Sequence, residues 1–144
     1  GLAVGTYMAV NACGEIYDQD KILAGALADD DRTIISSHRL MLEGYERNMG
    51  GNTSIGCIIT NADLTKTECR MVSTMAHDGL ARSIRPVHTS MDGDTLFTMA
   101  SGEVKTTIDT VGYLAEEAVR LAVLDAAASA EGMGGRPAYR DIIK

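Results

Sequence analysis

The sequence predicts an α+β fold in which helices pack over a sheet. Residues 53–60 form an apolar strand pattern, and a helical pattern follows from residue 65. The same order recurs further along, where a strand pattern at 95–100 precedes a long helical pattern. Because a sheet and its helices bury their apolar faces against each other, this order of elements indicates helices layered on one sheet.

The composition fits a single globular domain. The chain has 144 residues, of which 45% are hydrophobic, and this is enough to bury a core. A formal net charge of −7 argues against a surface that binds nucleic acid or an anionic membrane. No apolar run is long enough to span a bilayer. The three cysteines, Cys13, Cys57 and Cys69, lack CxxC spacing, which favours reduced thiols and a cytoplasmic location.

The first third of the chain is predicted to be the less regular part. Residues 2–12 read as a strand, and residues 15–18 are expected to return as a hairpin arm. The residues expected on one face of the first strand are Val4, Thr6, Met8 and Val10. The acidic run at 29–31 predicts a solvated turn. Residues 32–51 predict a linker with a short helix between 38 and 49.

Regular elements are predicted from residue 53 onward. The strand at 53–60 is almost continuously apolar, as expected when both faces are covered. Thr65 and Glu68 have the spacing of a capping box and predict the start of a helix that Pro86 closes. The residues expected on its buried face are Val72, Met75, Ala76, Gly79 and Leu80.

The last strand and helix are predicted in the same way. The strand at 95–100 is expected to end in a turn at Ser101-Gly102. Thr106 or Thr107 then caps a helix that runs to about residue 130. Its apolar arc is wide because three leucines lie beside the main face, so we expect burial on more than one side. These leucines are Leu114, Leu121 and Leu124.

The Asn52–Thr53 bond is the first candidate for chemistry. Gly50 and Gly51 come directly before this pair, which stands at the start of an apolar strand pattern. If the bond is cut, Thr53 becomes an N-terminal residue with a hydroxyl nucleophile and an α-amine whose ordinary pKa is about 7.7–8.0. One residue then supplies both halves of a nucleophile–base pair. The same pattern also fits an ordinary turn before a strand.

Three further polar residues stand at strand ends or turns. Asn11 ends the first strand, where its amide can donate to an oxyanion or bond its own turn. Asp92 and Asp94 flank a glycine and can hold an amine, ligate a metal or form a plain turn. His77 and His88 form no obvious triad with these residues and are interpreted as structural.

Several separate blocks occur in an order known from one family. They are Asn52–Gly56, Thr60–Lys66, Met75–Thr89 and Asp92–Thr95. Together with the opening strand from Val4 to Asn11, they resemble the L-aminopeptidase/D-Ala-esterase/amidase family, which also contains the β-peptidyl aminopeptidases. The resemblance runs over most of residues 2–125 and is weakest across 15–50.

The resemblance implies a self-cleaving N-terminal-nucleophile hydrolase with a four-layer α/β/β/α sandwich. Cleavage between Asn52 and Thr53 makes residues 1–52 the end of an α chain and residues 53–144 a β chain. No cofactor and no metal are implied.

The resemblance also implies roles for individual residues. Thr53 is the nucleophile, Asn11 the oxyanion donor and Asp94 a carboxylate near the nucleophile's amine. Asp92 matches a position that can be Ser in relatives, so its role is less defined.

The resemblance further implies the partners. The substrate is a small peptide, amide or ester that loses its N-terminal residue. Family members carry a long segment upstream of residue 1, so this chain is expected to be the C-terminal part of a single-domain precursor. That segment completes the sandwich, and cleaved pairs assemble as homo-oligomers. Neither a nucleic acid nor a membrane is implied as a partner.

Two other interpretations stay open. Ornithine acetyltransferases share the cleavage logic and a related fold, and they pass the acyl group to an amine instead of water. Alternatively, the chain is an uncleaved, inactive core that acts only in assembly.

Overall fold

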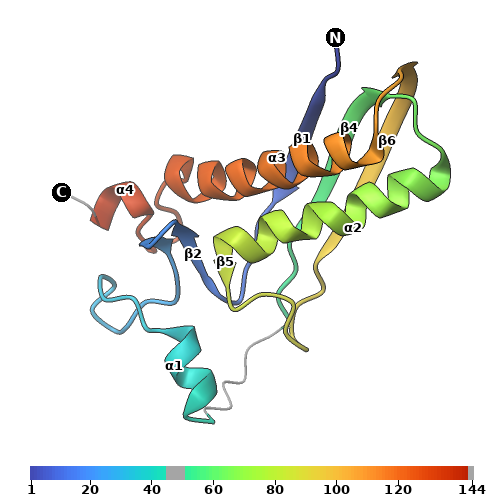
Figure 1. Ribbon diagram of the computed structural model, residues 1–144. Coiled ribbons are helices and arrows are strands. Elements are labelled where there is room, and N and C mark those ends of the chain that lie inside the picture. The colour runs from blue at the N-terminus through green and yellow to red at the C-terminus, as the bar shows by residue number, and fades with distance from the viewer. Residues whose placement is uncertain (45–50, 143–144) are drawn as a thin grey trace.

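Two long helices lie on one side of a three-stranded sheet (Figure 1). The computed structural model describes residues 1–44 and 51–142. The sheet has the order β1-β4-β6, with β1 antiparallel and β6 parallel to the central strand. Its strands are β1 (Val4–Ala9), β4 (Ile55–Ala62) and β6 (Thr95–Val104). The predicted α+β class is confirmed.

The helix layer consists of α2 (Lys66–Ser83) and α3 (Ile108–Ser129). The predicted capping box is present, because Thr65 accepts from the Glu68 amide and the Glu68 carboxylate accepts from the Thr65 amide. Thr107 caps α3 by accepting a hydrogen bond from the Thr110 amide. The two helices pack closely at Gly79, where an added Cβ would lie 2.3 Å from the Glu116 carbonyl oxygen. A glycine is therefore required at this contact.

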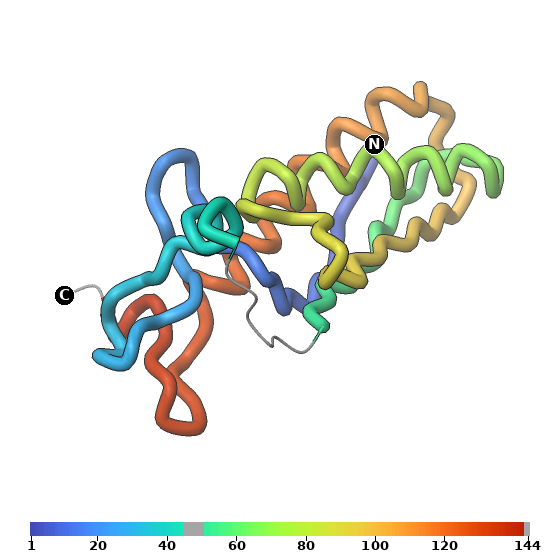
Figure 2. Tube along the Cα trace, turned by 90° about the horizontal axis from the view of Figure 1, so that it is seen from below, coloured from blue at the N-terminus to red at the C-terminus, as the bar shows by residue number. Residues whose placement is uncertain are grey.

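A second, small sheet lies at the other end of the molecule, away from the N-terminus (Figure 2). Its order is β3-β2-β5, and its strands are β2 (Glu15–Asp18), β3 (Lys21–Ala24) and β5 (Ile84–Arg85). The short helices α1 (Ser37–Leu42) and α4 (Tyr139–Ile142) lie at the same end (Figure 1). The predicted arm at 15–18 therefore forms a hairpin, but it pairs with β3 and β5 rather than with β1.

The main sheet has one covered face and one open face. On the covered face, Ile58 is fully buried beneath α2 and α3. Val72 and Ala76 of α2 and Val119 of α3 are fully buried in the same core. The open face is formed by five apolar residues of the three strands. They are Tyr7 (76% exposed), Ile55 (47%), Ile59 (45%), Phe97 (55%) and Met99 (62%). Within the described residues, the expectation that both faces of the strand at 53–60 are covered is wrong.

Several boundaries differ from the predictions for physical reasons. β6 continues through the predicted turn at Ser101-Gly102, because Gly102 adopts a φ of 81° within a register shift of the strand pair. α2 ends at Ser83 rather than at Pro86, since Ile84 and Arg85 pair with β2.

Other expectations fail on burial or position. Leu114 and Leu121 are exposed, so the wide apolar arc of α3 is covered mainly on the side that faces the sheet and α2. The short helix expected between 38 and 49 begins at Ser37 and ends at Leu42, whereas residues 45–50 lie outside the described part. No helix among residues 1–44 and 51–142 is both long and apolar enough to cross a membrane.

Candidate active site

The register of the main sheet places Asn11, Thr53 and Gly93 in one row. Ala9 pairs with Ile55 in the antiparallel pair, and continuing this register by two residues sets Asn11 opposite Thr53. The Asn52 side-chain amide donates to the Ala12 carbonyl at 2.9 Å, which agrees with that continuation.

The parallel strand supplies the third member of the row. Ile55 pairs with Thr95, and an isolated bridge between Asn52 and Asp92 extends the same register toward the start of both strands. Gly93 therefore lies beside Thr53. Three segments that are distant in the sequence thus meet at one end of the sheet.

Strand alternation decides the direction in which Thr53 points. Ser54 is fully buried on the side of the helices, whereas Thr53 is exposed like Ile55 and Ile59. Thr53 therefore lies at the end of the open face. Asn11 is also exposed and continues the outward positions of β1. The two residues that the sequence singled out first share one face and one end of the sheet.

The Thr53 hydroxyl lies directly against Gly93. A Cβ added to Gly93 would lie 2.6 Å from Thr53 Oγ1, which is closer than such contacts normally are. Only a glycine leaves this space without displacing the hydroxyl.

Backbone hydrogen bonds hold the peptide on both sides of Thr53. The Asn52 amide donates to the Met91 carbonyl at 3.0 Å, and the Gly93 amide donates to the Asn52 carbonyl at 2.8 Å. After Thr53, the Thr95 amide donates to the Ser54 carbonyl at 3.0 Å. The carbonyl of the expected cleavage bond is therefore fixed before any reaction.

Asp94 anchors the residue that follows Thr53. One of its oxygens accepts a 2.8 Å hydrogen bond from the Ser54 amide. Its carboxylate is almost fully buried, and the second oxygen, Oδ2, lies 3.2 Å from His88 Nδ1. His88 is therefore placed within ion-pair distance of this carboxylate. Asp92 has different contacts, because its Oδ2 accepts from the Thr89 amide and hydroxyl and ties that loop together.

The two histidines lie together beside Asp94, a grouping that sequence reasoning missed. The ring centroids of His77 and His88 are 4.9 Å apart, and His88 has an unusual φ of 56°. Burial lowers the pKa of His77 below its usual 6.5 and the charge of His88 lowers it further, while Asp94 and Asp78 act in the opposite direction. The available signal was the nearness of the Met75–Thr89 block to the Asp92–Thr95 block.

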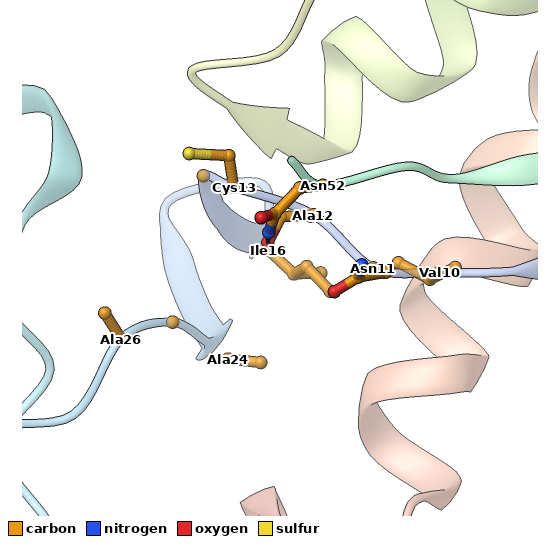
Figure 3. Close-up of a pocket in the computed structure, with 10 residues that line it drawn as sticks. Val10, Asn11, Ala12, Cys13, Ile16, Ala24, Ala26 and Asn52 are labelled. Carbon is orange, nitrogen blue, oxygen red and sulfur yellow. Dashed lines mark hydrogen bonds between the residues drawn. The ribbon is translucent and has the colours of Figure 1, made fainter. Parts of the chain in front are cut away.

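A pocket of about 370 Å³ lies next to this row (Figure 3). Asn11 and Asn52 enter it from the ends of neighbouring strands, and the hairpin of β2 and β3 forms its other side. Its volume falls in the range of small-molecule sites, about 300–1,000 Å³. The pocket gives space for a small ligand beside Asn11 and Asn52, and Thr53 is not among the residues that line it.

The chain belongs to peptidase family S58, which matches residues 1–140. An uncharacterized aminopeptidase of Mycobacterium tuberculosis (strain ATCC 25618 / H37Rv) is 34% identical over 166 residues, covering 99% of this chain and 48% of that protein. A 6-aminohexanoate-oligomer endohydrolase of Kocuria sp. (strain KY2) is 41% identical over 54 residues, covering 38% of this chain and 15% of that protein. The resemblance to a family of peptide and amide hydrolases is thereby confirmed.

A solved structure shares the fold. The crystal structure of the PH0078 protein from Pyrococcus horikoshii OT3 matches with a TM-score of 0.52 and 22% sequence identity, covering 94% of this chain and 42% of that chain. The chain spans about half the length of the curated relatives that match over its whole extent.

Proposed function

We propose that the protein is a self-processing aminopeptidase or amidase that uses Thr53 as its N-terminal nucleophile. The observation that carries this proposal is the row of Asn11, Thr53 and Gly93 at the end of the open face, beside a pocket. Membership in a peptidase family supports the reaction class. Cleavage divides the chain into residues 1–52 and 53–144.

Maturation begins with attack of the Thr53 hydroxyl oxygen on the Asn52 carbonyl carbon. The carbon–nitrogen bond breaks, the hydroxyl proton ends on the departing nitrogen, and an ester joins Asn52 to the Thr53 oxygen. Water then hydrolyses the ester. Asn52 ends the first fragment with a carboxylate, and Thr53 begins the second with a free amine.

Turnover uses the amine that maturation releases. It takes the proton of the Thr53 hydroxyl while the oxygen attacks a substrate carbonyl, and water later frees the acyl group. The Asn11 amide donates to the oxyanion. Asp94 holds the Ser54 amide and so keeps the nucleophile at the edge of the sheet. Asp92 orders the neighbouring loop through Thr89.

The proposed substrate is the N-terminal residue of a small peptide, amide or ester. A carboxylate must hold its ammonium group, and we place that carboxylate in the upstream segment expected from the family. The same segment covers the open face and completes the four-layer sandwich, and cleaved pairs form a homo-oligomer. The free thiols of Cys57 and Cys69 support a cytoplasmic location.

Two hydroxyl variants test the nucleophile in the full-length protein. Thr53→Ala is expected to abolish both cleavage and hydrolysis of amino-acid amides, whereas Thr53→Ser retains part of both. Ser54→Ala is the matched control, because the buried Ser54 hydroxyl has no hydrogen-bond partner among the described residues. Intact mass and N-terminal sequencing measure cleavage.

Three outcomes contradict the proposal. The first is a Thr53→Ala protein that still splits after Asn52. The second is a natural protein that stays one uncleaved species. The third is a cleaved protein that transfers acetyl from acetylated ornithine to glutamate and does not hydrolyse amides.

A further inference from the structure

We propose that the backbone amide of Gly93 is the oxyanion donor of the self-cleavage step, acting on the carbonyl of Asn52. This inference rests on the proposed function and assigns one donor to maturation and another, Asn11, to turnover. The separation follows from where each donor lies relative to the Asn52–Thr53 bond.

The distance between donor and acceptor fits this role before the reaction starts. The Gly93 nitrogen lies 2.8 Å from the Asn52 carbonyl oxygen. Effective oxyanion donors lie about 2.7–3.1 Å from the position that the oxyanion takes, and the Gly93 amide already donates to the carbonyl oxygen that becomes the oxyanion. When the Thr53 oxygen adds to the Asn52 carbon, the negative charge forms on that carbonyl oxygen, which the Gly93 amide already holds.

The donor is also rigidly held. The Asn52 amide donates to the Met91 carbonyl on one side, and the Thr95 amide donates to the Ser54 carbonyl on the other. These ladder bonds fix both strands around the Gly93 contact. A donor that needs no reorganisation during the reaction stabilises a transition state more than a mobile one.

The same glycine leaves room for the nucleophile. Thr53 Oγ1 would lie only 2.6 Å from a Cβ at position 93, so the hydroxyl fits there only because that side chain is missing. Gly93 thus faces two reacting groups. Its amide holds the carbonyl oxygen, and its bare Cα borders the attacking hydroxyl.

Asn11 is placed for a different carbonyl. Asn11 is exposed and lines the pocket, which offers space for a substrate, whereas the Asn52 carbonyl is bonded within the sheet. After cleavage, the Asn52 carbonyl becomes part of a carboxylate and no longer takes part in turnover. The Gly93 amide therefore serves the reaction once per molecule.

The chemical step balances without any other reactant. The Thr53 oxygen forms a bond to the Asn52 carbon, and the Gly93 N–H stabilises the oxyanion of the tetrahedral intermediate. The intermediate collapses as the bond to the Thr53 nitrogen breaks, and the hydroxyl proton ends on that nitrogen. Water then cleaves the ester, giving a carboxylate and restoring the hydroxyl.

Replacing single backbone amides by esters tests the donor directly. In a semisynthetic full-length protein, glycolic acid at position 93 replaces the N–H by an ester oxygen and leaves the side chains unchanged, and we expect cleavage to slow about 10²–10³-fold. The matched control is an ester at Thr95, which loses a comparable ladder bond to Ser54 without touching the Asn52 carbonyl. The control is expected to cleave at nearly the natural rate, and circular dichroism checks that both proteins fold.

A genetically encoded pair gives a second measurement. Gly93→Ala and Gly93→Pro both add a carbon beside the Thr53 hydroxyl, but only proline removes the N–H. Cleavage of the proline variant is expected to be much slower than that of the alanine variant. A proline variant that cleaves as fast as an alanine variant that still cleaves, or equal slowing by the two esters, would overturn the inference.

A pre-cleaved protein separates maturation from turnover. When the fragment starting at Thr53 is produced with a free N-terminus and combined with its partner segment, the ester at position 93 is expected to slow turnover far less than it slows cleavage in the uncleaved protein. An equal loss in turnover would contradict a role confined to maturation. The proposed function fails by a different result, namely cleavage in Thr53→Ala, so the two failures are distinguishable.

Discussion

The two faces of the main sheet differ although the same three strands form both. On the covered face, Ile58 and Leu96 are buried against α2 and α3. On the open face, Phe97 and Met99 are more than half exposed although they are equally apolar. Contiguous apolar surfaces of this kind normally mark a place where another element packs.

The comparison also explains the position of the candidate site. Thr53 lies at the end of the open face rather than under the helices, where Ser54 is sealed. A nucleophile in this position is reachable by a substrate until another layer covers the sheet. The relatives that match the whole chain are about twice its length, which gives the proposed covering segment enough residues.

The largest expected effect on stability comes from an alanine substitution on the covered face, compared with the same substitution at the neighbouring residue on the open face. Ile58→Ala removes a fully buried side chain and is expected to lower the free energy of unfolding by about 2–5 kcal/mol. Ile59→Ala lies on the open face and is expected to cost less than about 1 kcal/mol in the 144-residue chain. Urea titration measures both. Equal losses would show that the open face is buried in solution.

The contact between the two helices gives the next largest effect. Gly79→Ala places a Cβ against the Glu116 carbonyl, and such overpacking costs about 1–3 kcal/mol. Gly5→Ala is the control, because nothing lies within 4 Å of a Cβ at that position. The control is expected to be neutral or slightly stabilising. A harmless Gly79→Ala would mean that the helices sit further apart.

Loss of the N-cap of α2 tests how much of the covering layer depends on local structure. Thr65→Ala removes the capping hydroxyl and is expected to cost about 1 kcal/mol in thermal or urea unfolding. Thr67→Ala, an exposed threonine in the first turn, is the matched control. Indistinguishable values for the two variants would contradict the observed cap.

The smallest effect is a pH dependence on the covered side. The pKa of His77 is lowered in the folded protein, so the unfolded chain binds the proton more readily. The contribution of neutral His77 to the stability of the fold is fully present above pH 6.5 and is lost as the pH falls through the lowered pKa.

His77→Gln is expected to make the free energy of unfolding less dependent on pH between 6.5, the usual histidine pKa, and about 4.5, where glutamates titrate. NMR titration of the imidazole measures the pKa directly. A raised pKa, or an unchanged pH dependence in the variant, would contradict burial as the dominant cause.

Local patterns allowed much of the fold to be predicted. The capping box at Thr65 and the cap at Thr107 are interactions between residues three apart, so their spacing in the sequence is sufficient. Predictions that depended on distant partners were less successful. Ser101-Gly102 resembles a turn by composition, yet it lies within β6, where the pairing with β4 shifts register. Leu121 belongs to an apolar arc, but no described element covers it.

The sequence by itself determined which residues are chemically able to react: an Asn-Thr bond before an apolar strand, a strand-end Asn11 and an Asp-Gly-Asp turn, all within the blocks of a peptidase family. The tertiary structure alone decided which of them meet. Asp94 reaches the Ser54 amide across 40 residues of chain, and His88 joins it there. Strand register sets these contacts and the face on which Thr53 lies, and a slip of one residue would turn its hydroxyl beneath the helices.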